Sequence, residues 1–506
     1  MRADNGQREM STHVSKSQTF RNVLYNSLTR GGMLVCQLLA TTVVARSFSA
    51  SDMGVVGFAN ICIGFLMQFS DCGVGPATIR RPHLTQNNLE TAFTLKVFLG
   101  SGAFATVLLL APFAGHFCDH PAAGNVVSFL ALNFLISTIG FLPLVQITRE
   151  MNFKAIAVPA LINAGTRSAL IITLVLNGWK FWAVVLADLC ANLANGLALQ
   201  CVRKVKLRFR FDRDDIRETL KFGLPLLGTG VLFFLILNLA GFMVGAQLGI
   251  AALGYYTLAL NWGSFISAML GDTVNMVLFP TFAAIQNDLE KMRRWYLKTV
   301  DLVAFVAVVA NTALLANAHA FLVIFLGKGT EKWLPAAVTL QILCGYGILR
   351  AITEPLGNCL MARGKTRPLL AACALVGVVQ IVALMPALGT RKIEWVAVVI
   401  GVAYATQAFI YVPTLRREFS ITLTDLVKQL WPVGPALAAG WWATHALFAS
   451  NEGSLFTLAY RGLFTAVVTA LAHGLCTRFR CFQEVRELIS KKINRKLAAS
   501  QSPENS

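Results

Sequence analysis

The sequence predicts an all-α, polytopic membrane protein with about fourteen transmembrane helices. Its mean hydropathy is +0.61, and only 14% of its 506 residues are charged. Soluble domains carry about 25% charged residues, because water has to wet their surface. Here the charges gather between long apolar blocks, and a helix needs about twenty apolar residues to cross roughly 30 Å of hydrocarbon. These observations argue against a soluble protein of any class.

Apolar blocks of suitable length follow one another along the chain. They lie at 24–45, 53–71, 93–115, 125–147, 155–177, 179–200, 222–247, 252–279, 299–326, 334–361, 368–388, 394–415, 430–449 and 454–477. Many contain glycine, serine, threonine and asparagine, which favours close helix packing around an interior cavity. The segments between the blocks are too short to hold a soluble domain.

The blocks divide the chain into six parts. We expect a disordered cytoplasmic arm at 1–21, an N-terminal lobe of six spans at 22–200, a basic cytoplasmic linker at 201–221, a C-terminal lobe of six spans at 222–415, two further spans at 430–477 and a cytoplasmic tail at 478–506. The arm is not expected to be a signal peptide, because no apolar run follows its basic start.

The positions of the lysines and arginines predict the orientation of the spans. If the N-terminus lies inside, about 35 of the 44 fall in inner segments and about 6 in outer loops, as the positive-inside rule requires. Arg167, Arg350 and Arg461 fall within spans. The net charge of +19 is therefore a topology signal, and nucleic acid is not an expected partner. Both termini are expected in the cytoplasm.

Polar and glycine positions recur between the two halves of the chain. The corresponding pairs are Gly54 and Gly254, Asn60 and Asn261, and Asp71 and Asp272, each about 200 residues apart. Six spans per half is an even number, so both copies face the same way across the membrane. This predicts a parallel repeat with a substrate path between the two lobes.

Ordered motifs in both halves resemble the oligosaccharide-lipid flippases of the Wzx/RfbX polysaccharide transporter family, closest to the exopolysaccharide and colanic-acid type. The motifs are ARSFSASDMGV at 45–55, FSDCGVGPATIR at 69–80, Ala111-Pro112, LGYYTLA at 253–259, LFPTF at 278–282 and ARGK at 362–365. The resemblance covers roughly residues 20–420. It implies the two-lobe fold of the multidrug/oligosaccharidyl-lipid/polysaccharide (MOP) superfamily.

The resemblance also implies an activity, a location and partners. It implies that the chain is no enzyme but moves an undecaprenyl-pyrophosphate-linked sugar repeat unit to the periplasmic leaflet of a bacterial inner membrane, for exopolysaccharide or lipopolysaccharide biosynthesis. The expected partners are this lipid-linked oligosaccharide, the membrane lipids, and the polysaccharide polymerase and chain-length or export machinery. The family's residue roles vary too much for a set of functional residues to be carried over.

Charged residues inside spans are candidates for function, since each costs about 2.5–3.5 kcal/mol on insertion scales. Arg167 and Asp188 lie at similar depth in the fifth and sixth spans and can form an ion pair, which is either structural or part of a lumen or coupling site. In the tenth span, Arg350 and Glu354 lie on one polar helix face. That face lines either a water-filled lumen or a dry helix contact. Asp272 lies on a third polar face, in the eighth span.

Arginines near the ends of spans are candidates for binding the pyrophosphate, because a guanidinium fork suits paired oxygens. Arg30, Arg81 and Arg149 lie near the expected cytoplasmic mouth, and Arg46 lies at the outer end of the first span. The alternatives are topology charges or headgroup contacts for the first three and an interfacial anchor for Arg46. With Arg167 and Arg350 they are the candidate substrate-binding residues, and Asp188, Glu354 and Asp272 are the candidate coupling residues.

The sequence leads us to expect neither a cofactor nor a metal centre. His116, Cys118 and His120 form an H-x-C-x-H pattern in a short loop, but the fourth ligand of a structural metal site is lacking. Without an ATPase, energy would come from the membrane potential, or from proton or sodium coupling through an acidic residue such as Asp188 or Glu354.

Three alternatives remain open. The first is a multidrug or cation antiporter of the same superfamily, which would need an acidic, cation-receiving cavity. The second is a lipid II flippase, and the third is a membrane-embedded polymerase or ligase. An enzyme of that kind usually has a large outer loop, whereas every outer loop here is short.

Overall fold

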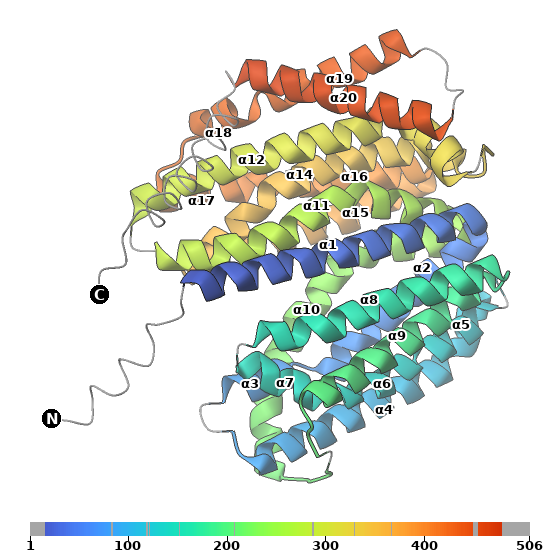
Figure 1. The fold of residues 1–506 in the computed structure, drawn as a ribbon, viewed down its shortest axis with the longest axis vertical. Coiled ribbons are helices and arrows are strands. Elements are labelled where there is room, and N and C mark those ends of the chain that lie inside the picture. The colour runs from blue at the N-terminus through green and yellow to red at the C-terminus, as the bar shows by residue number, and fades with distance from the viewer. Residues whose placement is uncertain are drawn as a thin grey trace, which may run out of the picture. The chain divides into compact units, whose positions relative to one another are not determined.

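The structure is a computed structural model, and every element it describes is a helix (Figure 1). It describes residues 16–81, 84–117, 120, 122–150, 152–206, 208–285, 288–327, 329–365, 367–448 and 454–477. Among the side chains outside this description are those of 16–30 and 272–277. The all-α fold class predicted from the sequence is confirmed.

The chain forms two compact units, which are described separately. Unit 1 runs to Asn238 and includes Gly249–Gly254, and unit 2 comprises Leu239–Leu248 and the described residues from Tyr255 on. The chain passes from unit 1 to unit 2 within one helix, α10 (Arg213–Leu248). The division into lobes at 22–200 and 222–415 with two added spans stays a prediction.

Unit 1 contains the first nine helices and most of the tenth. They are α1 (Lys16–Ser47), α2 (Ala50–Asp71), α3 (Val74–Arg80), α4 (Gln86–Phe117), α5 (Ala122–Leu130), α6 (Leu132–Ile139), α7 (Phe141–Arg149), α8 (Phe153–Leu176), α9 (Lys180–Val202) and α10. The expected single span at 125–147 is broken into α5, α6 and α7. One break is at Gly140, where an added Cβ would lie 2.9 Å from Leu199 and 3.1 Å from Gly196 of α9. The break thus coincides with a close approach of backbones.

Unit 2 contains the remaining helices, except for residues 250–254 at the start of α11, which belong to unit 1. They are α11 (Ile250–Ala284), α12 (Leu289–Ala316), α13 (Ala318–Ala320), the π-helix η2 (Phe321–Leu326), the 3₁₀-helix η3 (Leu334–Ala336), α14 (Ala337–Ala362), α15 (Arg367–Gly389), α16 (Ile393–Ala405), α17 (Ala408–Phe419), α18 (Leu423–Leu430), α19 (Val433–Leu447) and α20 (Leu455–Cys476). Within the expected span at 299–326, the helix α12 ends at Ala316. There the side chain of Asn317 donates to the Ala313 carbonyl and to Thr465.

Eleven helical segments of the described chain are long and apolar enough to cross a membrane. Each falls on one of the fourteen expected spans. The other three expected spans correspond to α1, α11 and α19, which are helical. For α1, the apolar part that could be assessed is Gly31–Ser47. The chain is therefore a multi-pass membrane protein, and the count of fourteen stays a prediction.

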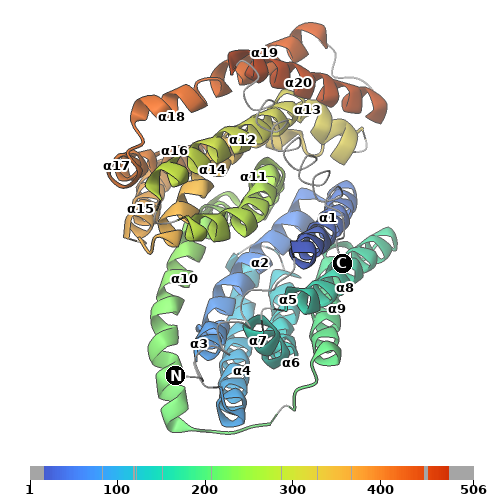
Figure 2. The same cartoon turned by 60° about the vertical axis from the view of Figure 1, so that its left-hand side comes forward.

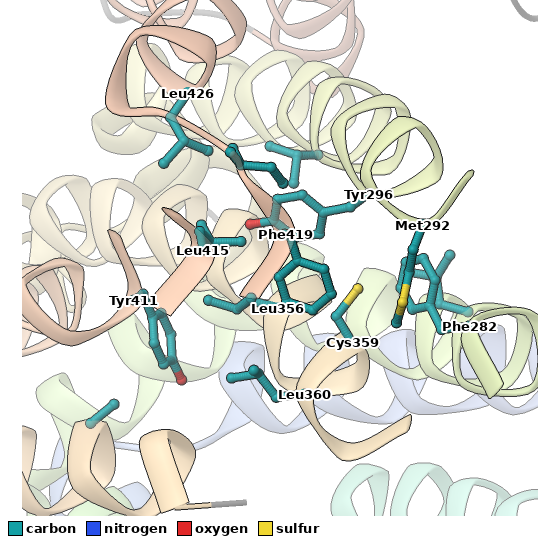
Figure 3. Packing of buried hydrophobic residues seen from close by; sticks show 14 residues of the cluster. Phe282, Met292, Tyr296, Leu356, Cys359, Leu360, Tyr411, Leu415, Phe419 and Leu426 are labelled. Carbon is teal, nitrogen blue, oxygen red and sulfur yellow. The ribbon is translucent and has the colours of Figure 1, made fainter. Parts of the chain in front are cut away.

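A cluster of buried apolar side chains holds the ends of several unit 2 helices together (Figure 3). Phe282 of α11, Met292 and Tyr296 of α12, Leu360 of α14 and Phe419 of α17 are each at most 4% exposed. Leu426 of α18 lies in the same cluster. α18 is thereby fixed at the end of unit 2, next to the start of α12.

A buried polar stripe joins the last helix to unit 2. Arg461, Thr465, Thr469 and His473, four residues apart on α20, are each at most 4% exposed. The hydroxyl of Thr465 accepts a hydrogen bond from Asn317 at 3.0 Å and lies 2.7 Å from the hydroxyl of Thr444 of α19. The His473 ring packs on Phe305 of α12 at 5.2 Å. We call this row the α20 stripe; α20 packs against α12 and α19 (Figure 2).

Two glycines permit a backbone crossing at the start of α2 and α11, within unit 1. A Cβ on Gly54 would overlap the carbonyl oxygen of Ile250, and a Cβ on Gly254 would overlap that of Ala50. Each glycine thus packs against the carbonyl group of the residue four positions before the other glycine. Such a reciprocal contact is what two-fold related elements make. The pair identified from the repeat in the sequence is therefore in direct contact.

Asp425 stabilises the start of α18, outside the spans, and its contribution should depend on pH. Hydrogen bonds from the Thr422 backbone N–H and hydroxyl, and then the Arg293 guanidinium at 2.8 Å, hold the pKa of this carboxyl below its usual value. The folded state therefore binds the proton less readily than the unfolded state, so stability falls with falling pH.

We expect Asp425→Asn to lower the thermal unfolding midpoint slightly at pH 7. The difference from the unchanged protein should shrink as the pH falls below about 4, the usual pKa of an aspartate. Differential scanning fluorimetry in detergent measures both midpoints. A difference that stays constant down to pH 3 would contradict this account of Asp425.

Candidate functional site

The candidate site in unit 1 is built on α8 and α9, which pack against one another. Arg167 of α8 donates from Nε to Oδ1 of Asp188 of α9 at 2.6 Å. The Asp188 side chain is 17% exposed and that of Arg167 is 44% exposed. The contact predicted from the depth of these residues is present. Because the guanidinium stays half exposed, it can offer further donors to a polar group.

Three asparagines extend this polar site and were missed from the sequence. Asn163 donates to Asn192 at 3.1 Å, and Asn192 donates to Asn133 of α6 at 2.8 Å. Asn163 lies one turn before Arg167 on α8, and Asn192 lies one turn after Asp188 on α9. The signal was available, since residues four apart share a helix face. We call these five residues the asparagine-arginine line.

A buried lysine in unit 1 was also missed. Lys96 of α4 is 2% exposed. Its ammonium group contacts the carboxylate of Asp71 at the end of α2 and lies 3.3 Å from the carbonyl oxygen of Ser70. The sequence drew attention to Asp71 through the repeat, but not to its partner. The Asp71 carboxylate is 60% exposed, so this pair combines a buried cation with an accessible anion.

The candidate site in unit 2 lies on α14. Arg350 donates from Nε to Oε1 of Glu354 at 3.2 Å, and both side chains are about a quarter exposed. One turn earlier, the ring of Tyr346 meets that of Tyr404 of α16 edge-on at 4.9 Å. A Cβ on Gly271 of α11 would overlap the Glu354 carboxylate. The carboxylate thus rests where α11 has no side chain.

The coupling candidate Asp272 follows Gly271 in α11, but its side chain lies outside the described residues. Asp272 therefore stays a candidate on its position in the sequence alone. The polar face predicted on the tenth span is present at Tyr346, Arg350 and Glu354.

Arg81 is engaged within unit 1. Its guanidinium donates to Asp215 at 2.8 Å and contacts Glu218 at 3.2 Å, and its side chain is 12% exposed. Asp215 also accepts from Asn88 at 2.6 Å. Arg81 therefore joins the end of α3 to the first turns of α10, and binding a headgroup would require it to exchange these partners.

For the other arginine candidates the structure gives mainly the position in a helix. Arg46 and Arg149 occupy the last turns of α1 and α7, where a cation stabilises the helix dipole. Arg30 belongs to α1, but its side chain lies outside the described residues.

The H-x-C-x-H loop falls largely outside the description. The side chains of His116 and Cys118 are not described, and the His120 ring lies 6.2 Å from that of Phe181. Across the described ranges, no group of three or more His, Cys, Asp or Glu residues is placed to hold a metal ion.

Several known proteins are similar to this chain in sequence. The family model described as "Polysaccharide biosynthesis protein" matches residues 43–338. The lipopolysaccharide biosynthesis protein WzxC of Escherichia coli K12 is 27% identical over 336 residues, 65% of this chain and 66% of that protein. The succinoglycan biosynthesis transport protein ExoT of Rhizobium meliloti is 22% identical over 286 residues, 56% of this chain and 57% of that protein. The alignments thus span less than two thirds of these relatives.

Two solved structures show the same fold. The lipid II flippase MurJ in its inward closed conformation has a TM-score of 0.74 at 12% identity, with coverage of 90% of this chain and 99% of that one. An inward-facing multidrug resistance transporter of the MATE family, from the MOP superfamily, has a TM-score of 0.60 at 15% identity, with coverage of 76% and 94%. At these identities the likeness concerns the fold alone.

Proposed function

The chain belongs to the polysaccharide biosynthesis protein family, whose model matches more than half of it, and from this premise we propose that it flips lipid-linked oligosaccharides across a membrane. The substrate class is an undecaprenyl-pyrophosphate-linked repeat unit, moved from the cytoplasmic to the periplasmic leaflet of a bacterial inner membrane. The chain acts as a transporter and not as an enzyme, with both termini in the cytoplasm. Names of relatives such as ExoT, a transport protein, support this assignment.

The observation that carries the proposal is the asparagine-arginine line in unit 1. Amide and guanidinium groups of α6, α8 and α9 follow one another inside helical segments that are long and apolar enough to span a membrane, with α6 forming the second part of the segment Ala122–Ile139. Ionisable residues in spans are rare and commonly mark a substrate or ion path. Amides can hydrogen-bond sugar hydroxyls, and a half-exposed guanidinium can bind phosphate oxygens.

The mechanism we propose is alternating access. The hydrophilic headgroup passes along polar side chains while the prenyl tail remains in lipid. The membrane potential is worth about 2.3 kcal/mol per charge per 100 mV, so a headgroup of charge about −2 leaving a negative interior gains roughly twice this amount over the full field. Proton or sodium coupling through Asp188, Glu354 or Asp272 is the competing source of energy.

The test is the leaflet distribution of lipid-linked sugar in cells without the protein. We expect a prenyl-linked oligosaccharide to accumulate at the cytoplasmic leaflet, out of reach of a membrane-impermeant label applied to spheroplasts. Restoring the gene should restore labelling, while lipid II, measured in the same extracts, should not change. Unchanged labelling of the oligosaccharide would refute the proposal, and accumulation of lipid II in its place would assign the chain to that substrate.

A further inference from the structure

A basic pocket lies in unit 1, away from the asparagine-arginine line. Its volume is about 530 Å³, and it lies between α4, α7 and the segment that joins α9 to α10. Four cations line it, namely Arg203, Lys204, Lys206 and Arg208, together with Gln86, Glu90 and Gln146. We call it the linker pocket. Four cations face a single carboxylate, so the pocket carries an excess of positive charge.

The segment that carries these cations is fixed against α4. The backbone N–H of Val205 donates to the Gln200 side chain at 3.3 Å, and that of Arg210 donates to the Thr94 hydroxyl at 2.9 Å. Val205 packs among the buried side chains of Leu89, Phe93 and Leu142. Charges that serve only to orient a membrane protein need no such fixed conformation.

The aromatic contact of Phe209 adds a further attachment. Its ring lies 5.5 Å from that of Phe93 of α4. Lys206 and Arg208 therefore lie between two attached residues, Val205 and Phe209, and Lys204 directly precedes the first of them. Much of the entropic cost of bringing their charges together is met by folding, which favours binding of an anion.

Local partners leave most of the positive charge available. Arg203 pairs with Glu150 at 3.0 Å and donates to the Gln146 side chain at 3.1 Å. Glu90 is 8% exposed and accepts from Gln86 at 3.2 Å. Within the described residues, no ion pair engages Lys204, Lys206 or Arg208, and each of the three is exposed. The excess charge thus rests mainly on these three.

We propose that the linker pocket binds a phosphate-bearing anion. Three available cations exceed the single charge of a carboxylate and match a group with two or more negative charges, such as a pyrophosphate or two neighbouring phosphates. Arginine and lysine are the side chains that recognise such oxygens, and basic pockets beside membrane spans bind anionic lipid headgroups. The anion comes either from an anionic phospholipid or from a pyrophosphate group outside the lipid leaflet. The site does not depend on the transport proposed above.

The experiment measures binding on the full-length protein in nanodiscs. One arm adds sodium pyrophosphate to nanodiscs of phosphatidylcholine, and the other replaces part of that lipid with phosphatidylglycerol. The readout is the thermal unfolding midpoint, and ionic strength is held constant with sodium chloride. The test variant is Lys204→Gln, Lys206→Gln and Arg208→Gln combined. The control removes three exposed cations from unit 2 by combining Arg416→Gln, Arg417→Gln and Lys428→Gln.

We expect at least one arm to raise the midpoint of the unchanged protein and of the control. The test variant should need at least tenfold more of the same anion for an equal shift. A response to pyrophosphate alone identifies a soluble or prenyl-linked phosphate as the source, and a response only to phosphatidylglycerol identifies the lipid. No response in either arm, or equal responses of test and control variants, overturns the proposal. If the triple variant does not fold, Arg208→Gln against Arg416→Gln makes the same comparison.

Discussion

Alanine at Gly54 or Gly254 should cause a large loss of both stability and transport. The added methyl group would overlap a carbonyl oxygen of the crossing helix, and backbone cannot move aside as a side chain can. Overpacking of this kind costs about 1–3 kcal/mol, and more when backbone has to shift. We expect each single variant to unfold several degrees lower and to fail to restore polysaccharide production in cells without the protein.

Gly102→Ala is the matched control for the two crossing glycines. Gly102 lies within α4, and a Cβ there would meet no atom within 4 Å. Alanine in place of a helical glycine gains about 0.5–1 kcal/mol in helix formation. The control should therefore be as stable as the original protein or more so. If Gly54→Ala unfolded at the same temperature as Gly102→Ala, this result would contradict the close crossing of α2 and α11.

Loss of one member of the Arg167–Asp188 pair should also have a large effect, because the other charge stays within a span. Breaking a fully buried pair costs about 3–5 kcal/mol. The Arg167 side chain is 44% exposed, so we expect a smaller loss, about 1–3 kcal/mol, for Arg167→Met or Asp188→Asn. Arg167→Lys keeps the charge and should lose less. Unfolding in detergent and transport in proteoliposomes are the two measurements.

Exchange of the two charges separates a structural role from a role in transport. Arg167→Asp combined with Asp188→Arg keeps an ion pair between α8 and α9, so we expect stability to recover. Transport should remain impaired, because the half-exposed guanidinium then projects from α9 instead of α8. Full recovery of transport would make the pair structural. Transport that survives collapse of the membrane potential but is lost in Asp188→Asn would exclude a purely electrical driving force.

The sequence predicted the features that depend on composition and periodicity. Apolar blocks located the helices, because crossing hydrocarbon sets a minimum length. The common depth of Arg167 and Asp188 predicted their contact, and four-residue spacing predicted the face shared by Arg350 and Glu354. The repeat drew attention to Gly54 and Gly254, although it did not show that they touch.

What the sequence did not predict depends on which helices become neighbours. Asn163 and Asn192 share helix faces with Arg167 and Asp188, but only the packing of α6, α8 and α9 joins them to one another and to Asn133. Lys96 was not singled out, because its partner Asp71 lies on another helix. The break between α6 and α7 coincides with the approach of α9 at Gly140, which no hydropathy pattern encodes.

The α20 stripe has a consequence for how the protein is assembled. A helix with Arg461 and His473 on one face would present polar groups to acyl chains if it were inserted alone, at a cost of several kcal/mol. Asn317, directly after α12, and Thr444 of α19 provide hydrogen-bonding partners for this face. The last helix is therefore expected to join the bundle soon after it leaves the translocation machinery. A chain cut before residue 430 would leave the polar side of α12 facing lipid and should be cleared by cellular proteases.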